Sequence, residues 1–460
     1  MNDTIAAIST AYGEAGVGIV RVSGPQASEI ADRVLKRSFN HQSSIQDWPT
    51  HTLHLDEIWD PLNKEKIDQV LVAVMWAPGS YTGEDVIELQ GHGGRLVIQE
   101  ILQAVLRAGA RLAEPGEFTK RAFLNGKMDL VQAEAVIDLI RARSEEARRL
   151  AVRQLDGKLS IRIRELQEEL VGIIAAMEAV MDFPEEGIVT EGSESVDILE
   201  VIKKFEEIIE GARGGRAIRE GIKVVIIGKP NVGKSSLWNA LIGEERAIVT
   251  EIPGTTRDML EEEVVVRGIP IRLVDTAGIR ETMDLVERIG VEKTREMLRR
   301  GQVVVVIFDA GEGIGAEDKK VVELVSGLST LIMINKTDLI PQKINEAEVD
   351  ALFPGEVVVW ASMKEKRGID ELKEAMVSKV LGSLNDGGEE WLVSSIRQEE
   401  ALRGCLNACR GALKASKEGL PAECILIDLY DALENLGNIT GEAVSEQVLD
   451  RIFAEFCIGK

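Results

Sequence analysis

One stretch, residues 222–236, limits the possible folds more than any other. It reads Ile-Lys-Val-Val-Ile-Ile-Gly-Lys-Pro-Asn-Val-Gly-Lys-Ser-Ser. The β-branched run predicts a buried strand, and the spacing Gly228-x-x-x-x-Gly233-Lys234-Ser235 after it is typical of a loop that cradles phosphates. In such a loop, backbone N–H groups face the β-phosphate, the lysine reaches the β and γ oxygens, and the serine hydroxyl binds Mg²⁺. The alternative is a turn that binds nothing, which the strand before the loop and the apolar helix after it disfavour.

Two further segments carry polar groups suited to a γ-phosphate. Residues 271–278, Ile-Arg-Leu-Val-Asp-Thr-Ala-Gly, predict a strand that ends in an acid and a tight turn. Asp275 is suited to hold the water shell of Mg²⁺, and the Gly278 N–H to meet the γ-phosphate. Before this strand, residues 254–258 form a polar loop in which Thr256 can bind Mg²⁺ when the γ-phosphate is present.

A third predicted strand, residues 331–338, ends in four residues suited to read a base, Asn335-Lys336-Thr337-Asp338. Asp338 can accept from guanine N1–H and the 2-amino group together, whereas adenine offers no such pair of donors. Lys336 can lie over the ring, and Asn335 can tie this loop to the phosphate loop. In this order, the segments resemble those of the Ras-like GTPases. The Ser-Ala-Lys of that family stands here as Ser362-Met363-Lys364, where the contact to guanine O6 is largely a backbone one.

The residue after the Asp-x-x-Gly turn departs from the Ras-like pattern. Ras-like enzymes often carry a Gln there, which orients the attacking water. Here the residue is Ile279, whose side chain has no donor or acceptor. The water must therefore be positioned by a group from a partner or by one of the charged residues just downstream, namely Arg280, Asp284, Glu287 and Arg288.

Length and composition narrow the class of protein. The chain has 460 residues, which is long for one domain and suits three. No apolar stretch reaches the roughly 18–20 residues of a membrane span, and the N-terminus lacks a signal-peptide pattern, so we expect a cytoplasmic protein. The four cysteines show no Cys-x-x-Cys pair and no nearby His that would suggest zinc, and we expect ordinary thiols at Cys405, Cys409, Cys424 and Cys457.

Charge is distributed unevenly. A net charge of −24 argues against indiscriminate nucleic-acid binding, but it leaves room for a local basic patch. One candidate is a cluster between residues 141 and 164. Either it binds tRNA phosphates or it is a solvated helix face, and the second interpretation is favoured. Its members are Arg141, Arg143, Arg148, Arg149, Arg153, Lys158, Arg162 and Arg164.

Hydrophobic periodicity changes along the chain. Residues 1–120 mix strands, Gly-rich turns and helices, as in an α+β unit. Residues 121–220 and 385–460 show helical periodicity, and residues 221–384 hold the nucleotide motifs. Each helical segment has an apolar face that it cannot bury alone, so we expect the two to pack as one bundle. The predicted fold class is multidomain α/β, with a Ras-like P-loop GTPase domain inserted in an α-helical bundle and preceded by an α+β domain.

The two ends of the chain carry motifs of their own. The C-terminus ends in an amphipathic helix followed by Cys457-Ile-Gly-Lys460. The N-terminal part contains residues 18–24 (Gly-Ile-Val-Arg-Val-Ser-Gly), residues 81–94 with Glu88 near their centre, and residues 114–127, which end in Asn-Gly-Lys. Together these stretches resemble the MnmE (TrmE) family of tRNA modification GTPases over nearly the whole chain, in the same domain order.

The resemblance implies a function and partners. Residues 1–120 would be a folate-binding and dimerisation domain, so a homodimer is expected. With the FAD-dependent MnmG (GidA), in a heterotetramer, the family modifies C5 of the wobble uridine of certain tRNAs, giving a 5-carboxymethylaminomethyl-type group from a tetrahydrofolate one-carbon unit. Arg21, Glu88 and Lys127 would contact 5-formyl-tetrahydrofolate, with Lys460 close by and Cys457 as the functional thiol. The alternative is a regulatory GTPase in ribosome assembly, which would need neither a folate motif nor a terminal cysteine.

The resemblance also implies how GTP is hydrolysed. A potassium ion takes the place of an arginine finger, held by Asn231 and by backbone groups around Thr250, Ile252 and Thr255, while Glu287 positions the water and Arg280 is a further catalytic candidate. The phosphates and Mg²⁺ are expected at Asn231, Val232, Gly233, Lys234, Ser235, Ser236, Thr250, Glu251, Ile252, Pro253, Gly254, Thr255, Thr256, Asp275, Thr276, Ala277 and Gly278. The guanosine is expected at Asn335, Lys336, Thr337, Asp338, Ser362, Met363 and Lys364.

Overall fold

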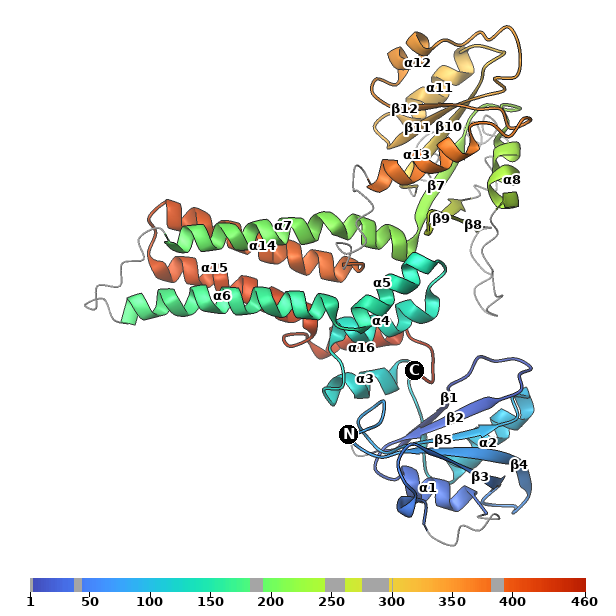
Figure 1. The fold of residues 1–460 in the computed structure, drawn as a ribbon, viewed down its shortest axis with the longest axis vertical. Coiled ribbons are helices and arrows are strands. Elements are labelled where there is room, and N and C mark those ends of the chain that lie inside the picture. Colours follow the sequence, from blue (N-terminus) through green and yellow to red (C-terminus); the bar gives the residue numbers. More distant parts are fainter. Residues whose placement is uncertain are drawn as a thin grey trace. The chain divides into compact units, whose positions relative to one another are not determined.

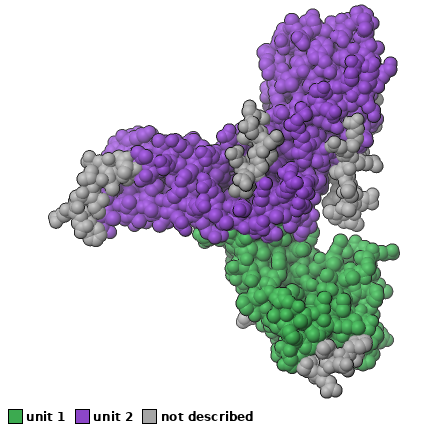
Figure 2. All heavy atoms as spheres, in the orientation of Figure 1, with its two compact units in different colours: residues 1–137, 437–460 green, residues 138–436 purple. Residues whose placement is uncertain are grey.

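The computed structural model describes residues 3–36, 44–182, 193–244, 261–274, 298–299, 301–381 and 393–460. The chain divides into two compact units, shown in different colours in Figure 2. Unit 1 comprises residues 1–137 and 437–460, so the two ends of the chain share it, and unit 2 comprises residues 138–436. The predicted boundaries at residues 120, 220 and 384 stay predictions.

Unit 1 is built on a six-stranded sheet in the order β3-β4-β5-β2-β1-β6 (Figure 1). Its pairs are antiparallel except β1 with β6. Along β4, Val70, Val72 and Val74 alternate with more exposed residues, as expected of a strand with one face on a core. That core includes side chains of α1 and α2. The elements are β1 Ile5–Ile8, β2 Gly18–Ser23, α1 Ala27–Val34, η1 Ile45–Asp47, β3 Thr52–Trp59, β4 Lys66–Met75, β5 Val86–Gly91, α2 Arg95–Arg107 and β6 Arg111–Leu112.

Short helices from both ends of the chain complete unit 1. A second apolar cluster joins the first residues of α4 to α16, with Leu130, Phe453 and Phe456 among its buried members. Phe453 lies near both Phe123 and Phe456, with ring centroids 6.4 and 5.5 Å away. The last helix of the chain, α16, is therefore packed beside α3 and the first turns of α4. These helices are α3 Glu117–Leu124, α4 Leu130–Arg141 and α16 Glu446–Ala454.

Unit 2 contains the second sheet, in the order β12-β11-β10-β7-β9-β8. All of its pairs are parallel except β8 with β9. β10 is buried along its whole length, as expected of a central parallel strand with an apolar cluster on each face. The elements are β7 Ile222–Ile227, α8 Lys234–Glu244, β8 Glu261–Val266, β9 Ile269–Val274, β10 Val303–Asp309, α11 Ala316–Val325, β11 Thr330–Asn335, α12 Glu346–Leu352, β12 Val357–Trp360 and α13 Ile369–Leu381.

Long helices form the rest of unit 2. α7 packs against α14, so the helical segments before and after the sheet lie together as one bundle (Figure 1). The predicted fold class, with a nucleotide domain inserted in a helical bundle, is confirmed. The helices are α5 Glu145–Leu155, α6 Lys158–Asp182, α7 Ser193–Glu220, α14 Ile396–Lys417 and α15 Ala422–Thr440.

Candidate functional site

The phosphate loop lies between the end of β7 and the start of α8. β7 has β9 on one side and β10 on the other, so the loop leaves the sheet where the order of successive strands changes from one side of β7 to the other. Open α/β sheets bind ligands at such a point. The first helical N–H groups of α8 and the exposed hydroxyls of Ser235 and Ser236 lie at this end of the sheet.

Lys234 is held over the phosphate loop. Its Nζ donates to the carbonyl oxygens of Gly228 and Lys229, each at 2.8 Å. Burial lowers the pKa of Lys234, and the described residues offer it carbonyl oxygens but no acid. A lysine in this position gains most from a bound anion, because phosphate oxygens would replace neutral acceptors with charged ones.

Asn335 connects the end of β11 to the phosphate loop. Its Nδ2 donates to Val232 O at 2.8 Å, and its Oδ1 accepts from Met363 N at 3.2 Å. A Cβ at Gly233 would lie 2.2 Å from that Nδ2, so the amide fits only because residue 233 is glycine. One side chain therefore joins the phosphate loop, the end of β11 and the loop after β12.

The predicted base-reading residues lie together at the ends of β11 and β12. Asp338 Oδ1 accepts from Ser362 Oγ at 2.7 Å, and this hydrogen bond holds the pKa of Asp338 below its ordinary value. Lys364 Nζ lies 4.0 Å from Asp338 Oδ2. Thr337 donates to Ala361 O through both its N–H and its hydroxyl. Because the carboxylate is already ionised and oriented, it is ready to accept from paired N–H donors.

Thirteen of the nucleotide and catalytic residues predicted from the sequence lie outside the described residues. They are Thr250, Glu251, Ile252, Pro253, Gly254, Thr255, Thr256, Asp275, Thr276, Ala277, Gly278, Arg280 and Glu287. Within the described part of the chain, no group of three His, Cys, Asp or Glu side chains could hold a metal ion. An ion bound by one serine hydroxyl and by nucleotide oxygens needs no such group, so Ser235 remains suited to Mg²⁺.

A second polar site lies in unit 1. Arg21 of β2 stands opposite Glu88 of β5 in the strand register, and its Nε donates to Glu88 Oε1 at 2.9 Å. The guanidinium lies over the rings of Tyr81 and Phe118, 5.6 and 5.7 Å from their centroids. Lys127 donates to Pro78 O at 2.9 Å, in the segment between β4 and β5. Aromatic faces and two charges of opposite sign therefore meet at this end of the sheet.

The C-terminal residues reach the same site. Lys460 lies close enough to Arg21, Glu88 and Cys457 for all three to influence its titration. Burial is the main cause that lowers the pKa of Lys460, with Arg21 second, while Glu88 and Cys457 act in the opposite direction. The structure thus places Lys460, at the C-terminal end of the sequence, near Arg21 of β2 and Glu88 of β5, with Cys457 in the same tight turn as Lys460.

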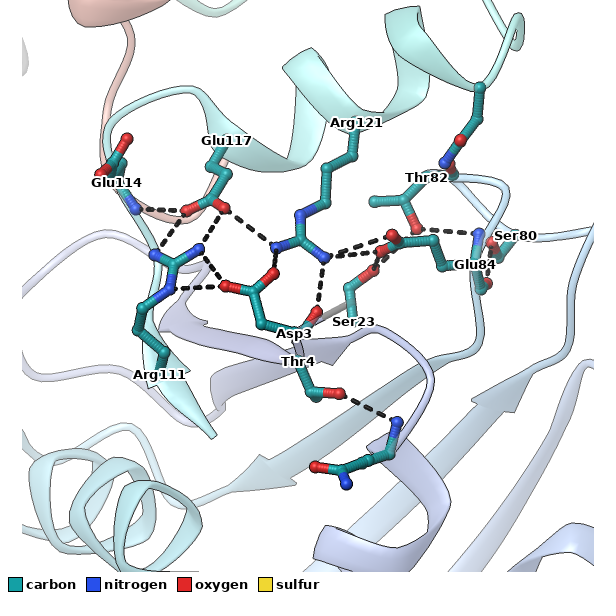
Figure 3. Close-up of polar contacts among 12 residues, drawn as sticks. Asp3, Thr4, Ser23, Ser80, Thr82, Glu84, Arg111, Glu114, Glu117 and Arg121 are labelled. Carbon is teal, nitrogen blue, oxygen red and sulfur yellow. Dashed lines mark hydrogen bonds and ion pairs between the residues drawn. The ribbon is translucent and has the colours of Figure 1, made fainter. Parts of the chain in front are cut away.

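A buried charge network supports this second site (Figure 3). Arg121 of α3, only 1% exposed, donates to Asp3, Glu84 and Glu117. Burial by itself would lower the pKa of Arg121, but its acidic partners raise it above the ordinary value. Glu84 also accepts from Ser23 Oγ at 2.8 Å. The network ties α3 to β2 and to the segment that carries Tyr81, and so it fixes the surroundings of Arg21.

Comparisons with known proteins agree over the whole chain. A family model described as the GTP-binding protein TrmE N-terminus matches residues 4–127, and one described as the MnmE helical domain matches residues 130–457. The tRNA modification GTPase MnmE of Heliobacterium modesticaldum is 47% identical over 100% of both chains. Those of Geobacillus kaustophilus and Desulforamulus reducens are 46% and 44% identical, over 100% of this chain and 99% and 100% of theirs. This chain belongs to the MnmE family of tRNA modification GTPases.

Membership of the MnmE family settles the broad function, since the relatives match from end to end. The chain is a GTP hydrolase of tRNA modification, and the alternative of a ribosome-assembly GTPase is set aside. Both polar sites described above lie in parts of the chain that the relatives share.

The structure also shows site residues that the sequence analysis missed. Lys336 Nζ lies 2.6 Å from Oδ2 of the buried Asp309, at the end of β10. Lys229, inside the phosphate loop, pairs with Asp318 and Glu312 at 3.1 and 2.9 Å. Asp309 could have been found, because in the sequence it directly follows an apolar run, Val303 to Phe308, just as Asp275 follows the predicted strand before it. Asp318 gave no comparable signal.

The basic cluster of residues 141–164 is largely neutralised within the chain. Arg143 pairs with Glu263, Arg148 and Arg149 with Glu145, and Arg162 with Glu165. Most of these pairs are exposed, so each adds little to stability. Arginines that already have acidic partners fit the favoured interpretation, a solvated helix face.

Proposed function

We propose that this protein hydrolyses GTP in a potassium-dependent reaction and, with the FAD-dependent MnmG (GidA), modifies C5 of the wobble uridine of certain tRNAs. The product is a 5-carboxymethylaminomethyl-type uridine made with a tetrahydrofolate one-carbon unit. One observation carries the proposal beyond family membership, namely that Lys460, in the same C-terminal turn as Cys457, lies near the Arg21–Glu88 pair. A GTPase that only regulates would not need this arrangement.

The residues of this second site suit 5-formyl-tetrahydrofolate. The pterin edge carries several N–H donors, which Glu88 can accept, and the folate carboxylates suit Arg21, Lys127 and Lys460. The rings of Tyr81 and Phe118 beside Arg21 offer apolar faces for an aromatic ligand. A bound folate would supply the one-carbon unit. The chain itself supplies the charges that orient this ligand and a thiol within reach of Lys460.

For hydrolysis, the chain has to stabilise charge on the β–γ bridge and position a water. With GTP bound, Lys234 would contact the β and γ oxygens and Ser235 would hold Mg²⁺. Asn231 is exposed at the start of the loop, where its amide oxygen can bind a potassium ion. A cation there stabilises the negative charge that develops as the bond breaks. We assign the positioning of the attacking water to Glu287, with Arg280 as the second catalytic candidate.

The surface of unit 1 supports a homodimer. Leu53 and Leu55 of β3 are 60% and 42% exposed, and Leu71 of β4, which pairs with Leu55, is 42% exposed. These leucines lie side by side on the two strands at one edge of the sheet. Adjacent exposed leucines on an edge hairpin are typical of a surface that another chain covers.

We further propose that the protein acts in the cytoplasm, as a homodimer that forms a heterotetramer with MnmG (GidA) and binds tRNA. None of the described helices is long and apolar enough to cross a bilayer.

Binding of labelled 5-formyl-tetrahydrofolate tests the proposal directly. Glu88→Gln and Arg21→Gln should each weaken binding by about tenfold or more, because each removes a charge that contacts the ligand. Glu100→Gln, which makes the same charge change as Glu88→Gln at an exposed position of α2, should leave folate affinity unchanged. GTP turnover should stay the same in all three variants. Equal folate affinity in wild type and Glu88→Gln would refute the assignment of this site.

A further inference from the structure

The last residues of the chain pass the backbone of β1 at a point where only glycine fits. Gly459 has a φ of +97°, a left-handed conformation that side chains disfavour. A Cβ there would lie 2.1 Å from Ile8 O and 3.2 Å from Ser9 Cα. The first contact is with a backbone carbonyl inside a sheet, which cannot move aside as a flexible side chain could. Any larger residue at 459 must therefore displace the end of the chain.

A second glycine fixes the start of the same segment. Gly116, just before α3, has a φ of +68°, and a Cβ there would lie 2.6 Å from Phe453 O in α16. The Gly116 N–H donates to Cys457 O at 3.4 Å. Pro115 and Ile458 form an antiparallel bridge next to this bond. The chain thus leaves α16 along the backbone of residues 115 and 116.

Side chains contribute little to holding this segment. Cys457 is exposed and Ile458 is 54% exposed, so neither anchors the chain by burial. The Lys460 N–H donates to Cys457 O at 3.3 Å, which closes a tight turn. The path from residue 457 to residue 460 is therefore set by backbone contacts on either side of it, at Gly116 and at Gly459.

We propose that Gly116 and Gly459 are positioning residues, which set where the Cys457 thiol and the Lys460 ammonium lie relative to the Arg21–Glu88 pair. The two close backbone approaches act as a clamp at each end of a four-residue segment in which the side chains of Cys457 and Ile458 are exposed. The inference rests on the proposed function, because only the function proposed for Cys457 gives the clamp a role in tRNA modification.

Gly126 provides a matched control. It lies in the same unit, after α3, and it has the same φ of +68° as Gly116. A Cβ at Gly126 would meet nothing within 4 Å. Alanine at 126 therefore introduces the strain of a left-handed alanine and nothing more, whereas alanine at 116 adds the clash with Phe453 O. The difference between the two variants isolates the contact with the C-terminal segment.

The position of the segment can be measured without reference to tRNA. Carboxypeptidase B removes a C-terminal lysine, and Lys460 is partly buried in the folded protein. In full-length Gly116→Ala, release of Lys460 should be roughly tenfold faster than in wild type or Gly126→Ala. Gly459→Ala leaves the start of α3 untouched and should show the same increase. For Gly459→Ala, the rate of Lys460 release from the folded protein is divided by the rate from the same variant unfolded in urea, because the substitution changes the residue before the cleaved bond.

The functional readout uses strains that carry only one variant each. Wobble-uridine modification should fall at least about tenfold in Gly116→Ala and Gly459→Ala and stay normal in Gly126→Ala, while GTP turnover stays normal in all three. Equal Lys460 release from Gly116→Ala and Gly126→Ala would overturn the clamp. If Cys457→Ser abolishes the modification but Gly116→Ala and Gly459→Ala both release Lys460 faster and still modify the uridine normally, the clamp has no role in tRNA modification. Normal modification in Cys457→Ser would refute the function proposed for the thiol, and Lys460 release would still decide the position of the segment.

Discussion

Lys336 owes its orientation to a carboxylate on the neighbouring strand. Asp309 holds its Nζ at 2.6 Å and also accepts from Gly311 N at 2.9 Å, so the acid is itself fixed. We expect Asp309→Asn to weaken GDP binding by about tenfold, since Lys336, which is predicted to lie over the base, loses the charge that orients it. Fluorescent-nucleotide titration measures this, with Asp350→Asn, an exposed acid of α12, as the control. Equal GDP affinity in Asp309→Asn and wild type would show that Lys336 needs no such partner.

Base specificity should change with a single atom at Asp338. In Asp338→Asn, the new amide N–H can donate to the carbonyl of xanthine, while the 2-amino group of guanine meets a poorer acceptor. We therefore expect weaker GTP binding and a preference for xanthosine triphosphate. Competition between the two nucleotides for the variant gives the answer, and unchanged GTP affinity would mean that another residue reads the base.

Potassium dependence should follow from Asn231. In place of the glutamine of Ras-like enzymes the chain has Ile279, so a different source of transition-state stabilisation is needed. We expect GTP turnover to be much faster in potassium than in sodium, and Asn231→Ala to remove most of that difference while nucleotide affinity changes little. Initial rates in matched chloride salts measure it. Equal wild-type rates in the two salts would exclude a potassium ion from the mechanism.

At the residue scale, the sequence predicted what local chemistry determines. Asn335 and Asp338 follow a strand within a recognised spacing, and the structure brings them to Val232 and Ser362. The partners of Lys229 could not be predicted, because Asp318 lies 89 positions away and only the β10–α11 connection brings it close. Motifs indicate what a residue offers a ligand, whereas pairings between protein residues depend on the whole sheet.

At the scale of elements, α5 forms part of the core of the nucleotide-binding sheet. Ala147 and Leu150 of α5 belong to the same buried cluster as Val264 and Val266 of β8. We expect Leu150→Ala to destabilise this part of unit 2 by about 2–4 kcal/mol, through the loss of buried methyl groups and the cavity that remains. Amide hydrogen exchange of β9 should accelerate accordingly. Leu420→Ala, an exposed leucine before α15, should leave β9 unchanged, and protection equal to wild type in Leu150→Ala would exclude the shared core.

Two elements show where periodicity fails. β3 was not predicted, because its leucines at 53 and 55 face outward while Asp56 is buried, the reverse of the usual alternation. α7 continues to Glu220 through several glycines, which disfavour a helix. One of them, Gly215, lies where the backbone of Val393 passes so closely that a Cβ would lie 1.9 Å from its carbonyl oxygen. Tertiary packing thus overrides helix propensity there.

At the scale of the whole molecule, the residues alone predicted the order of the domains. They did not predict that the two ends of the chain meet in one unit. A change from mixed to helical periodicity marks the segments, and two unpaired apolar faces predict a bundle. Nothing in the spacing of Cys457 and Lys460 indicates that Lys460 lies near a charged pair on β2 and β5. Only the resemblance to the MnmE family implied that Lys460 is near Arg21 and Glu88, since such a contact joins positions more than 350 residues apart.

The central claim is that the terminal thiol serves tRNA modification and that the GTPase chemistry is separate. Cys457 is exposed and lies three residues before Lys460, so Cys457→Ser should cost little packing while it replaces the thiol with a far poorer nucleophile that has no redox chemistry. The decisive measurement is nucleoside analysis of tRNA from a strain carrying only Cys457→Ser, paired with GTP turnover of the purified variant. We expect the modified wobble uridine to be absent and GTP turnover to equal that of wild type. Normal levels of the modified uridine in that strain would contradict the account.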